Sequence, residues 1–195
     1  MMFVFKNKIK KRRPARFSKH EQQTKAGEEL SRIDLFIQKM EQIDATTPEQ
    51  LGDKLLSLIA RENEIIQGAL FLADSSKNSS KLKFVSGYAC DLEVCKTLTF
   101  DPGEGFPGQV FADRTVINLK DFPEGYMKIR TGLGEASPRS LLLFPILHSG
   151  DPVGVVELAS FGEFQKEDEL FYGQLSETIA RQFKNLKTKK KSQGA

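Results

Sequence analysis

The sequence predicts an α+β domain in which terminal helices pack on one face of a mostly antiparallel sheet. The first observation behind this prediction is the order of the patterns, which runs from helical segments through short apolar strands with one small helix inserted to a last helical segment. The second is composition: 39% hydrophobic and 28% charged residues are close to the globular average and exclude disordered and collagen-like chains. The third is length, since 195 residues suit one domain with appendages.

Helical signals open the domain. Apolar residues recur at heptad spacing within 21–45, at Leu30, Ile33, Ile37 and Met40. A second helix is predicted to begin at Thr47 as the N-cap, with Pro48 in its first turn and Gln50 at the third position. We therefore expect the first helix to lie outside the domain as an outrigger, and the second to begin the domain.

The middle of the chain carries the strand signals. Short apolar runs bounded by turn residues predict strands at 69–73, 82–86, 96–100, 116–119, 141–147 and 153–159. A short helix is expected at 108–113, between the third and fourth of these strands. The stripe of Leu175, Ile179, Phe183 and Leu186, extended by Phe171, predicts a final helix.

Charge is distributed unevenly along the chain. Residues 1–20 hold eight basic side chains and residues 184–195 hold five, without an acid in either segment, so 21–183 carries 16 basic against 26 acidic residues and a net charge of −10. An acidic body argues against nucleic acid as a partner. We expect 1–20 to be a basic, solvated arm and 188–195 a basic tail, with contact to an acidic membrane surface as the alternative.

The location expected is cytoplasmic, with peripheral attachment at the inner face of the membrane left open. The longest apolar stretch, 141–147, is too short to span a bilayer, and the basic run follows the first apolar residues, unlike in a signal peptide. Two cysteines, Cys90 and Cys95, cannot build a disulfide framework and suit a reducing compartment.

Catalytic and metal motifs are not found. The glycines of 103–108 match a phosphate-loop pattern, but neither the strand and long crossover helix of a dinucleotide site nor the kinase motifs accompany them. They are expected to supply positive φ for a turn. Two histidines and two cysteines do not form a metal set. The sequence thus predicts neither an enzyme nor a metal site, and it names no cofactor.

The segments 103–111, 115–119, 143–146 and 154–161 together resemble a GAF domain. The segments 126–136 and 175–180 are similar to the GAF modules of bacterial multidomain sensors and histidine kinases, which function in two-component signalling. The resemblance covers about 48–186 and sets the expected domain at 46–187. It implies a six-stranded sheet, a ligand pocket roofed by short helices and middle loops, and a homodimer formed through the terminal helices.

Differences between this sequence and the motifs of known family members exclude some of the functions that the family performs. The chain has neither the motif of cyclic-nucleotide-binding members nor the chromophore cysteine of phytochromes. Where free methionine sulfoxide reductases of this fold place a cysteine, the chain has Pro107, and Cys95 lies upstream of that turn. The resemblance therefore favours a non-catalytic sensory domain that binds a small molecule or a signalling-protein partner. An enzyme of the reductase type and a purely structural dimerisation or scaffold module stay open.

A candidate pocket follows from loop and strand aromatics and from one carboxylate. Glu157 stands in the otherwise apolar strand 153–159, so burial would require a partner or a polar ligand. Arg130 and Arg139 are its expected partners, either in a structural ion pair or as polar anchors of a ligand. The full candidate set is Phe84, Phe100, Phe106, Tyr126, Ile129, Arg130, Arg139 and Glu157.

Overall fold

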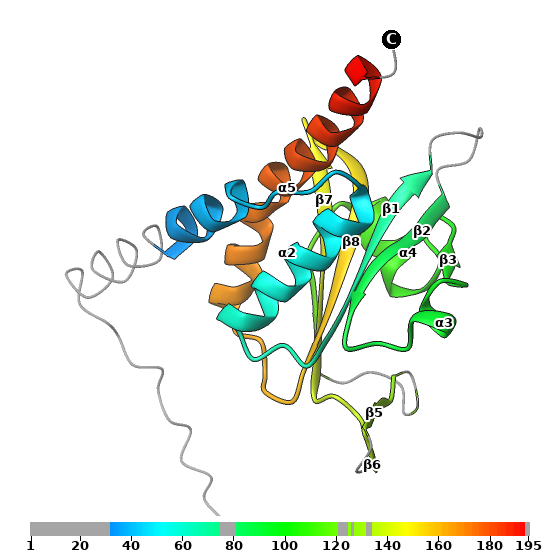
Figure 1. Cartoon of the computed structure of the whole chain (residues 1–195). Coiled ribbons are helices and arrows are strands. Elements are labelled where there is room, and N and C mark those ends of the chain that lie inside the picture. The colour runs from blue at the N-terminus through cyan, green and yellow to red at the C-terminus, as the bar shows by residue number, and fades with distance from the viewer. Residues whose placement is uncertain (1–31, 75–80, 121–124, 126, 132–133, 194–195) are drawn as a thin grey trace, which may run out of the picture.

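The computed structural model describes residues 32–74, 81–120, 125, 127–131 and 134–193, and among these it leaves out the side chains of 130, 131 and 187–193. A six-stranded sheet lies between two unequal layers (Figure 1). Its strands run in the order β3-β2-β1-β8-β7-β4, and every neighbouring pair is antiparallel. The α+β class and the six-stranded sheet expected from the sequence are confirmed.

Four long strands form the centre of the sheet. They are β1 (Gln67–Asp74), β2 (Lys81–Tyr88), β7 (Ser140–His148) and β8 (Asp151–Ser160). The edges are short, with β3 (Thr99–Phe100) on one side and β4 (Ile117–Leu119) on the other. The predicted strands agree with these except at 96–100, where only the last two residues pair with β2. Short edge strands limit pairing with other chains.

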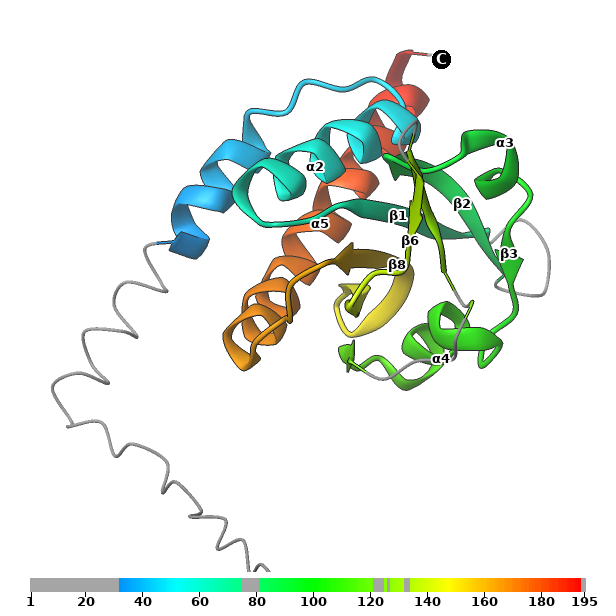
Figure 2. The same cartoon turned by 90° about the horizontal axis from the view of Figure 1, so that it is seen from below.

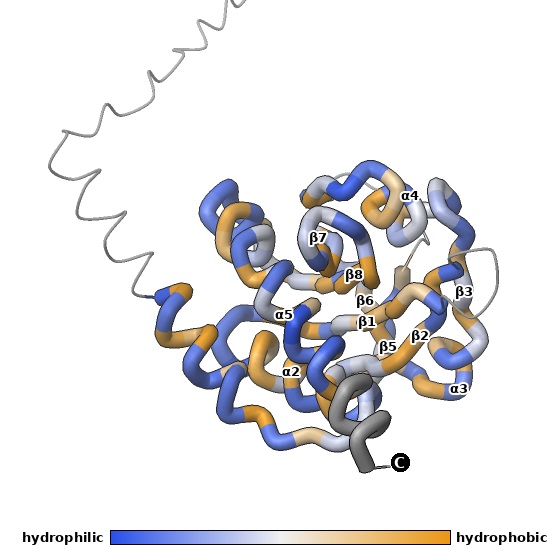
Figure 3. Tube along the Cα trace, turned by 90° about the horizontal axis from the view of Figure 1, so that it is seen from above, coloured by the Kyte–Doolittle hydropathy of each residue, from blue (hydrophilic) through white to orange (hydrophobic). Residues whose placement is uncertain are grey.

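Helices α2 (Pro48–Glu62) and α5 (Lys166–Gln193) cover one face of the sheet (Figure 2). The last helix buries the stripe that the sequence predicts, including Leu175 and Ile179. Alternate residues of β7, such as Leu142 and Phe144, meet these helices, while Leu141 and Leu143 face the other layer. Burial on both faces explains why β7 is an almost unbroken apolar run. Figure 3 shows that hydrophobic (orange) and hydrophilic (blue) stretches alternate along the helices that cover the sheet.

The start of α2 follows its predicted cap. Thr47 Oγ1 accepts a hydrogen bond from the Gln50 amide at 3.2 Å, and Pro48 occupies the first turn. Gln50 Oε1 accepts in return from the Thr46 amide at 3.1 Å. The cap fixes where the helix begins and so how it crosses β1 and β2.

The N-terminal helix, described over 32–41, corrects the outrigger prediction. Ile33, Phe36 and Met40 are buried in the same core as α2 and α5. The rings of Phe36 and Phe171 lie edge to face, 5.3 Å apart between centroids. The heptad stripe packs against α5 of its own chain because that helix presents an apolar side that α2 leaves uncovered. Leu30 lies outside the described residues.

The opposite layer consists of short elements (Figure 2). They are α3 (Leu92–Cys95), α4 (Gly105–Asp113) and a separate hairpin of β5 (Ile129–Thr131) and β6 (Gly134–Ala136). The turn before α4 uses Gly103 and Gly105 at φ of 84° and 58°, which confirms the role expected of these glycines. Among the described helices, none is long and apolar enough to cross a membrane.

Candidate functional site

Three of the predicted pocket aromatics are core residues. Phe84 and Phe100 pack edge to face on the fully buried ring of Phe71, with centroid distances of 6.0 and 5.3 Å. Phe106 packs partly buried against the same core. These three half-buried rings pack against the core that lies on the α4 side of the sheet.

The hairpin β5–β6 holds the next predicted residues. Ile129 is buried at the start of β5. Tyr126 and the side chain of Arg130 lie outside the described residues. The hairpin stands on the face of the sheet that the sequence assigns to the pocket roof.

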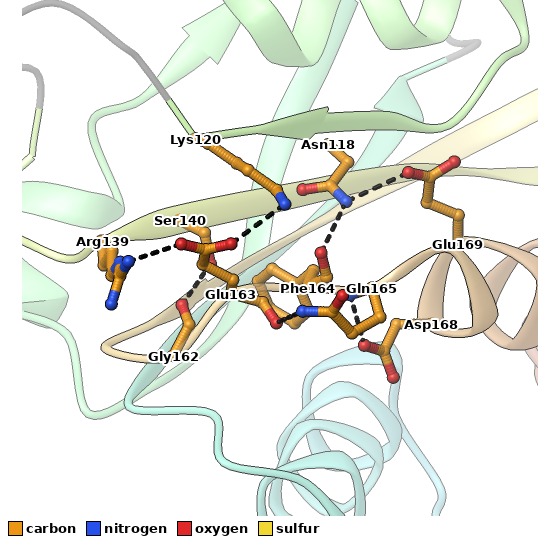
Figure 4. A network of polar contacts seen from close by, with 10 residues as sticks. All are labelled: Asn118, Lys120, Arg139, Ser140, Gly162, Glu163, Phe164, Gln165, Asp168 and Glu169. Carbon is orange, nitrogen blue, oxygen red and sulfur yellow. Dashed lines mark hydrogen bonds and ion pairs between the residues drawn. The ribbon is translucent and has the colours of Figure 1, made fainter. Parts of the chain in front are cut away.

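Arg139 pairs with a different carboxylate from the one predicted. Its Nη2 lies 2.6 Å from Glu163 Oε1, and Lys120 Nζ lies 3.0 Å from Glu163 Oε2 (Figure 4). The hydrogen bond from Lys120, its charge and that of Arg139 lower the pKa of Glu163 below its ordinary value. Arg139 reaches Glu163 because it precedes β7 and lies beside the β8–α5 turn.

Glu157 lies on the face of the sheet that was predicted. It is half-buried, and across the strands it stands opposite Ala69 and Leu143. The carboxylate has an interaction partner. Its neighbours along β8 on this face, Val155 and Ala159, belong to the core beneath α4. Glu157 is thus a polar position within an apolar face.

The polar network around Glu163 (Figure 4) borders a hollow of about 590 Å³. Asn118 Nδ2 donates to the Phe164 carbonyl and to Glu169 Oε1, both at 3.0 Å. Hydrogen bonds from Lys166 and Asn118 lower the pKa of Glu169 against the opposing effect of burial. Asn118 Oδ1 is buried without a hydrogen-bond partner among the described residues. The contacts made by Asn118 Nδ2 join β4 to the start of α5.

A second hollow, of about 650 Å³, lies beside α3 and is of the size that small ligands occupy. Its wall comes from the start of β1, the turn after β2, α3 and the segment that leads into the hairpin. The residues that line it are Gln67, Ala89, Cys90, Asp91, Val94, Cys95, Gly125 and Lys128. We call this hollow the α3 pocket. Among the described residues that line it, none belongs to the predicted set.

Gln67 lines the α3 pocket and carries a buried side-chain oxygen. Its Oε1 is buried and has no hydrogen-bond partner among the described residues. Gln67 stands opposite Ala159, and the next pair along the strands is Ala69 with Glu157, so Gln67 and Glu157 are diagonal neighbours on one face. A buried carbonyl oxygen without a donor is destabilising by about 1–3 kcal/mol. The side-chain oxygen of Gln67 therefore has unused hydrogen-bonding capacity.

Two charged residues lie at the wall of the pocket. Lys128 Nζ makes an exposed ion pair with Glu135 at 3.5 Å, a weak contact that can be exchanged for a ligand's anionic group. Asp91 is committed to the backbone, since its Oδ1 accepts from the amides of Glu93 and Val94 at the start of α3. Lys128 is thus the charged group available to a ligand.

Both cysteines of the chain line this pocket. Each is half-buried and neither forms a disulfide. Burial raises the pKa of the Cys90 thiol to about 12, with further contributions from its hydrogen bond to Cys95 and from the charge of that neighbour. The described residues contain no group of three or more side chains that could hold a metal ion.

A family model for the GAF domain matches residues 45–182. A comparison with the curated proteins finds no match. Among solved structures, the chain is similar to the GAF domain from a phosphoenolpyruvate-protein phosphotransferase of Coxiella burnetii. The identity is 21%, the TM-score is 0.67, and the match covers 83% of this chain and 95% of that one.

Two further structures show the same fold. The GAF domain from an Acinetobacter phosphoenolpyruvate-protein phosphotransferase has 15% identity and a TM-score of 0.65, with coverage of 82% and 95%. A free methionine-R-sulfoxide reductase from Neisseria meningitidis, determined in complex with its substrate, has 17% identity and a TM-score of 0.59, with coverage of 80% and 88%. Identities this low establish the fold and leave the chemistry to the residues of this chain.

Proposed function

Because the chain belongs to the GAF domain family, we propose that it is a non-catalytic sensory or regulatory domain that binds a small molecule in the α3 pocket. The observation that carries the proposal is the buried Oε1 of Gln67, which has no hydrogen-bond donor among the described residues and lies in the wall of that pocket. A ligand N–H group would satisfy it, and burial of the pair would favour the bound state.

The two polar groups indicate the class of ligand. Gln67 offers an acceptor and Lys128 offers a positive charge, so a small molecule with an N–H donor and a carboxylate fits both. Free amino acids have this chemistry. The reductase from Neisseria meningitidis, determined with its substrate bound, supports the use of this fold for a small ligand.

The test uses the full chain and the free L-amino acids as probes. We expect one amino acid or a related group of them to raise the melting temperature and to appear as a bound species in native mass spectrometry. Lys128→Ala should abolish the shift. Lys120→Ala is the matched control, since Lys120 pairs with Glu163 beside a separate hollow. Absence of any shift, together with protein that purifies from its host without a small molecule, would contradict the proposal.

We propose that the terminal helices communicate ligand binding to a partner. Gln67 of the pocket wall shares a face of the sheet with Ala69, which packs against the core beneath α4, whereas α2 and α5 pack on the opposite face. We propose that the chain acts as a homodimer or with a signalling-protein partner at this helical face, where Leu35 and Leu170 are exposed apolar residues. Light scattering that gives a particle near the mass of one chain, 21.9 kDa, across micromolar concentrations would contradict the homodimer.

The basic arm is proposed to attach a cytoplasmic protein to an acidic membrane surface. Residues 1–20 contain eight basic side chains, and each basic residue near such a surface contributes about 1 kcal/mol. Deletion of 1–20 should abolish co-sedimentation with acidic vesicles at low salt. Unchanged co-sedimentation would leave the arm without this role.

One observation favours an enzyme as the second candidate. Both cysteines line the α3 pocket, and similar structures include free methionine sulfoxide reductases. Against it, the position where the resemblance places a reductase cysteine is Pro107, which is buried in α4. We expect no turnover of free methionine sulfoxide with a thiol reductant. Turnover that is lost in Cys95→Ser would favour the enzyme.

A further inference from the structure

The α3 pocket brings together the two cysteines of the chain, a feature that the proposed function leaves unused. Cys90 follows the end of β2, and Cys95, five positions later in the sequence, ends α3. Both side chains contribute to the same wall, and the neighbouring Cys95 adds to the raised pKa of Cys90. Two half-buried thiols at one pocket wall can react as a unit.

The backbone between them turns sharply. Ala89 adopts a φ of 52°, in the left-handed region that alanine rarely occupies. Asp91 then caps the one-turn helix α3, and the amide of Cys95 donates to the Asp91 carbonyl at 2.8 Å. One helical turn after the cap returns the chain toward Cys90, which is why the two thiols meet.

Gly87 on strand β2 makes room for the first thiol. A Cβ atom at this position would lie 2.2 Å from Cys90 Sγ and 3.0 Å from the Phe84 ring. Any side chain at position 87 would therefore push the Cys90 sulfur away from its place. The glycine and the strained Ala89 are independent features of the backbone, and both hold the Cys90 thiol beside Cys95.

We propose that Cys90 and Cys95 are an oxidation site, at which a low-molecular-weight disulfide converts the two thiols into an intramolecular Cys90–Cys95 disulfide. In the first step, the Cys95 thiolate attacks one sulfur of the small disulfide, forms a mixed disulfide and releases one small thiolate. In the second, Cys90 gives its proton to solvent and its sulfur attacks Cys95 Sγ, which releases the second small thiolate. Two electrons pass from the pair to the small disulfide.

The order of attack follows from the surroundings of Cys90. Burial and the neighbouring Cys95 raise the pKa of Cys90, so its thiol stays protonated while Cys95 is free. Once Cys95 is part of a mixed disulfide, its contributions to the raised pKa of Cys90 are removed, and burial remains as the cause. A metal is a poor alternative occupant, because the described residues offer no third ligand for a soft ion there. The inference stands whether or not the pocket binds a small molecule.

The experiment treats the full chain with oxidised glutathione and follows free thiols and peptide masses. No lysine or arginine lies between Lys83 and Lys96, so trypsin releases both cysteines in the peptide 84–96. We expect this peptide to lose two hydrogens and to carry no glutathione, with both thiols consumed together. Cys90→Ser and Cys95→Ser should instead keep one glutathione on the remaining cysteine. Two glutathiones on the wild-type chain, or disulfide-linked dimers, would overturn the proposal.

Gly87→Ala tests the placement while both cysteines are kept. Its Cβ displaces the Cys90 sulfur, so the mixed disulfide should accumulate and ring closure should slow by at least about tenfold. Gly173→Ala is the matched control, because its Cβ meets only Val116 at an ordinary 3.7 Å. Ring closure in folded Gly87→Ala at the wild-type rate would contradict the role of the glycine. Should Gly87→Ala fail to fold, the two serine variants still decide the proposal.

Discussion

Tyr172 is the largest fully buried side chain among the described residues. Its ring stacks on Phe144 at 5.2 Å between centroids, but its hydroxyl has no hydrogen-bond partner in the described part of the chain. Burial of an unpartnered hydroxyl opposes folding. Tyr172→Phe should therefore raise the free energy of unfolding at pH 7 by about 1 kcal/mol in urea denaturation. A loss of stability would show that the hydroxyl has a partner.

The same residue gives a pH prediction. Burial is the main cause that raises the pKa of Tyr172 above its ordinary value of 10.0. The neutral phenol is thus favoured by folding, and this contribution is complete below pH 10 and is lost as the pH rises toward the folded-state pKa. Above pH 10, wild type should lose stability faster than Tyr172→Phe. Parallel pH profiles for the two proteins would contradict this.

Ser176 shows how one hydroxyl can satisfy two backbone groups. Its Oγ donates to the Pro145 carbonyl at 2.7 Å and accepts from the Leu147 amide at 2.8 Å. These groups flank the point where the register of β7 with β8 shifts. Ser176→Ala should lower the free energy of unfolding by about 1–3 kcal/mol, because both backbone groups lose their partner. Gln174→Ala, at an exposed position of the same helix, should change it by less than about 0.5 kcal/mol.

At the scale of elements, close packing of α2 on β2 depends on Gly52. A Cβ there would lie 2.7 Å from the Cβ of Ser86. Alanine is the better helix former by about 1 kcal/mol, yet we expect Gly52→Ala to lower the free energy of unfolding by about 1–3 kcal/mol, since overlap in a packed interface outweighs propensity. Adding Ser86→Gly should restore part of the loss. A stabilised single variant would show that the helix can shift outward.

Helices and strands with regularly spaced or continuous apolar residues were predictable from the sequence. Short elements that depend on a single contact, such as a helix cap, were not. The apolar runs predicted β7 and β8 to within one or two residues of the observed bounds. The stripe predicted α5 but not its extension to Lys166 and Gln193. The four-residue α3 depends on the cap from Asp91 and has no period of its own. The hairpin β5–β6 has three-residue strands with few apolar residues, so it too went unpredicted.

The sequence predicted which face of the sheet holds the candidate site, but not which residues form its wall. Glu157 lies on the correct side of the sheet because alternation along a strand fixes the face of each residue. Which residues form the pocket wall depends on how α3, Gly125 and Lys128 approach the start of β1, and no local pattern encodes that. Gln67 carries a weak signal, as a polar residue at the start of an apolar strand, but only its burial without a donor marks it.

At the scale of the whole molecule, the packing of the N-terminal helix determines which surface α5 presents. The helix over 32–41 buries Phe36 against Phe171, and the Arg32 guanidinium lies 4.3 Å from the centre of the Phe171 ring. Arg181 and Gln182 of α5 also contact this helix, at Glu41 and at the Met40 carbonyl. The terminal helices therefore form one unit with the sheet, and a partner at this face meets both of them.

Phe36 and its neighbour Leu35 test this packing as a matched pair. Phe36 is 3% exposed and Leu35 is 53% exposed. Phe36→Ala should lower the free energy of unfolding by about 3 kcal/mol, since it empties a site in the core, while Leu35→Ala should change it by less than about 0.5 kcal/mol. Because the contact is made within one chain, the difference between wild type and Phe36→Ala should not vary when the protein concentration is changed about a hundredfold. A difference that grows with concentration would place Phe36 in an interface between chains, and equal losses for the two variants would show that the helix does not pack through Phe36.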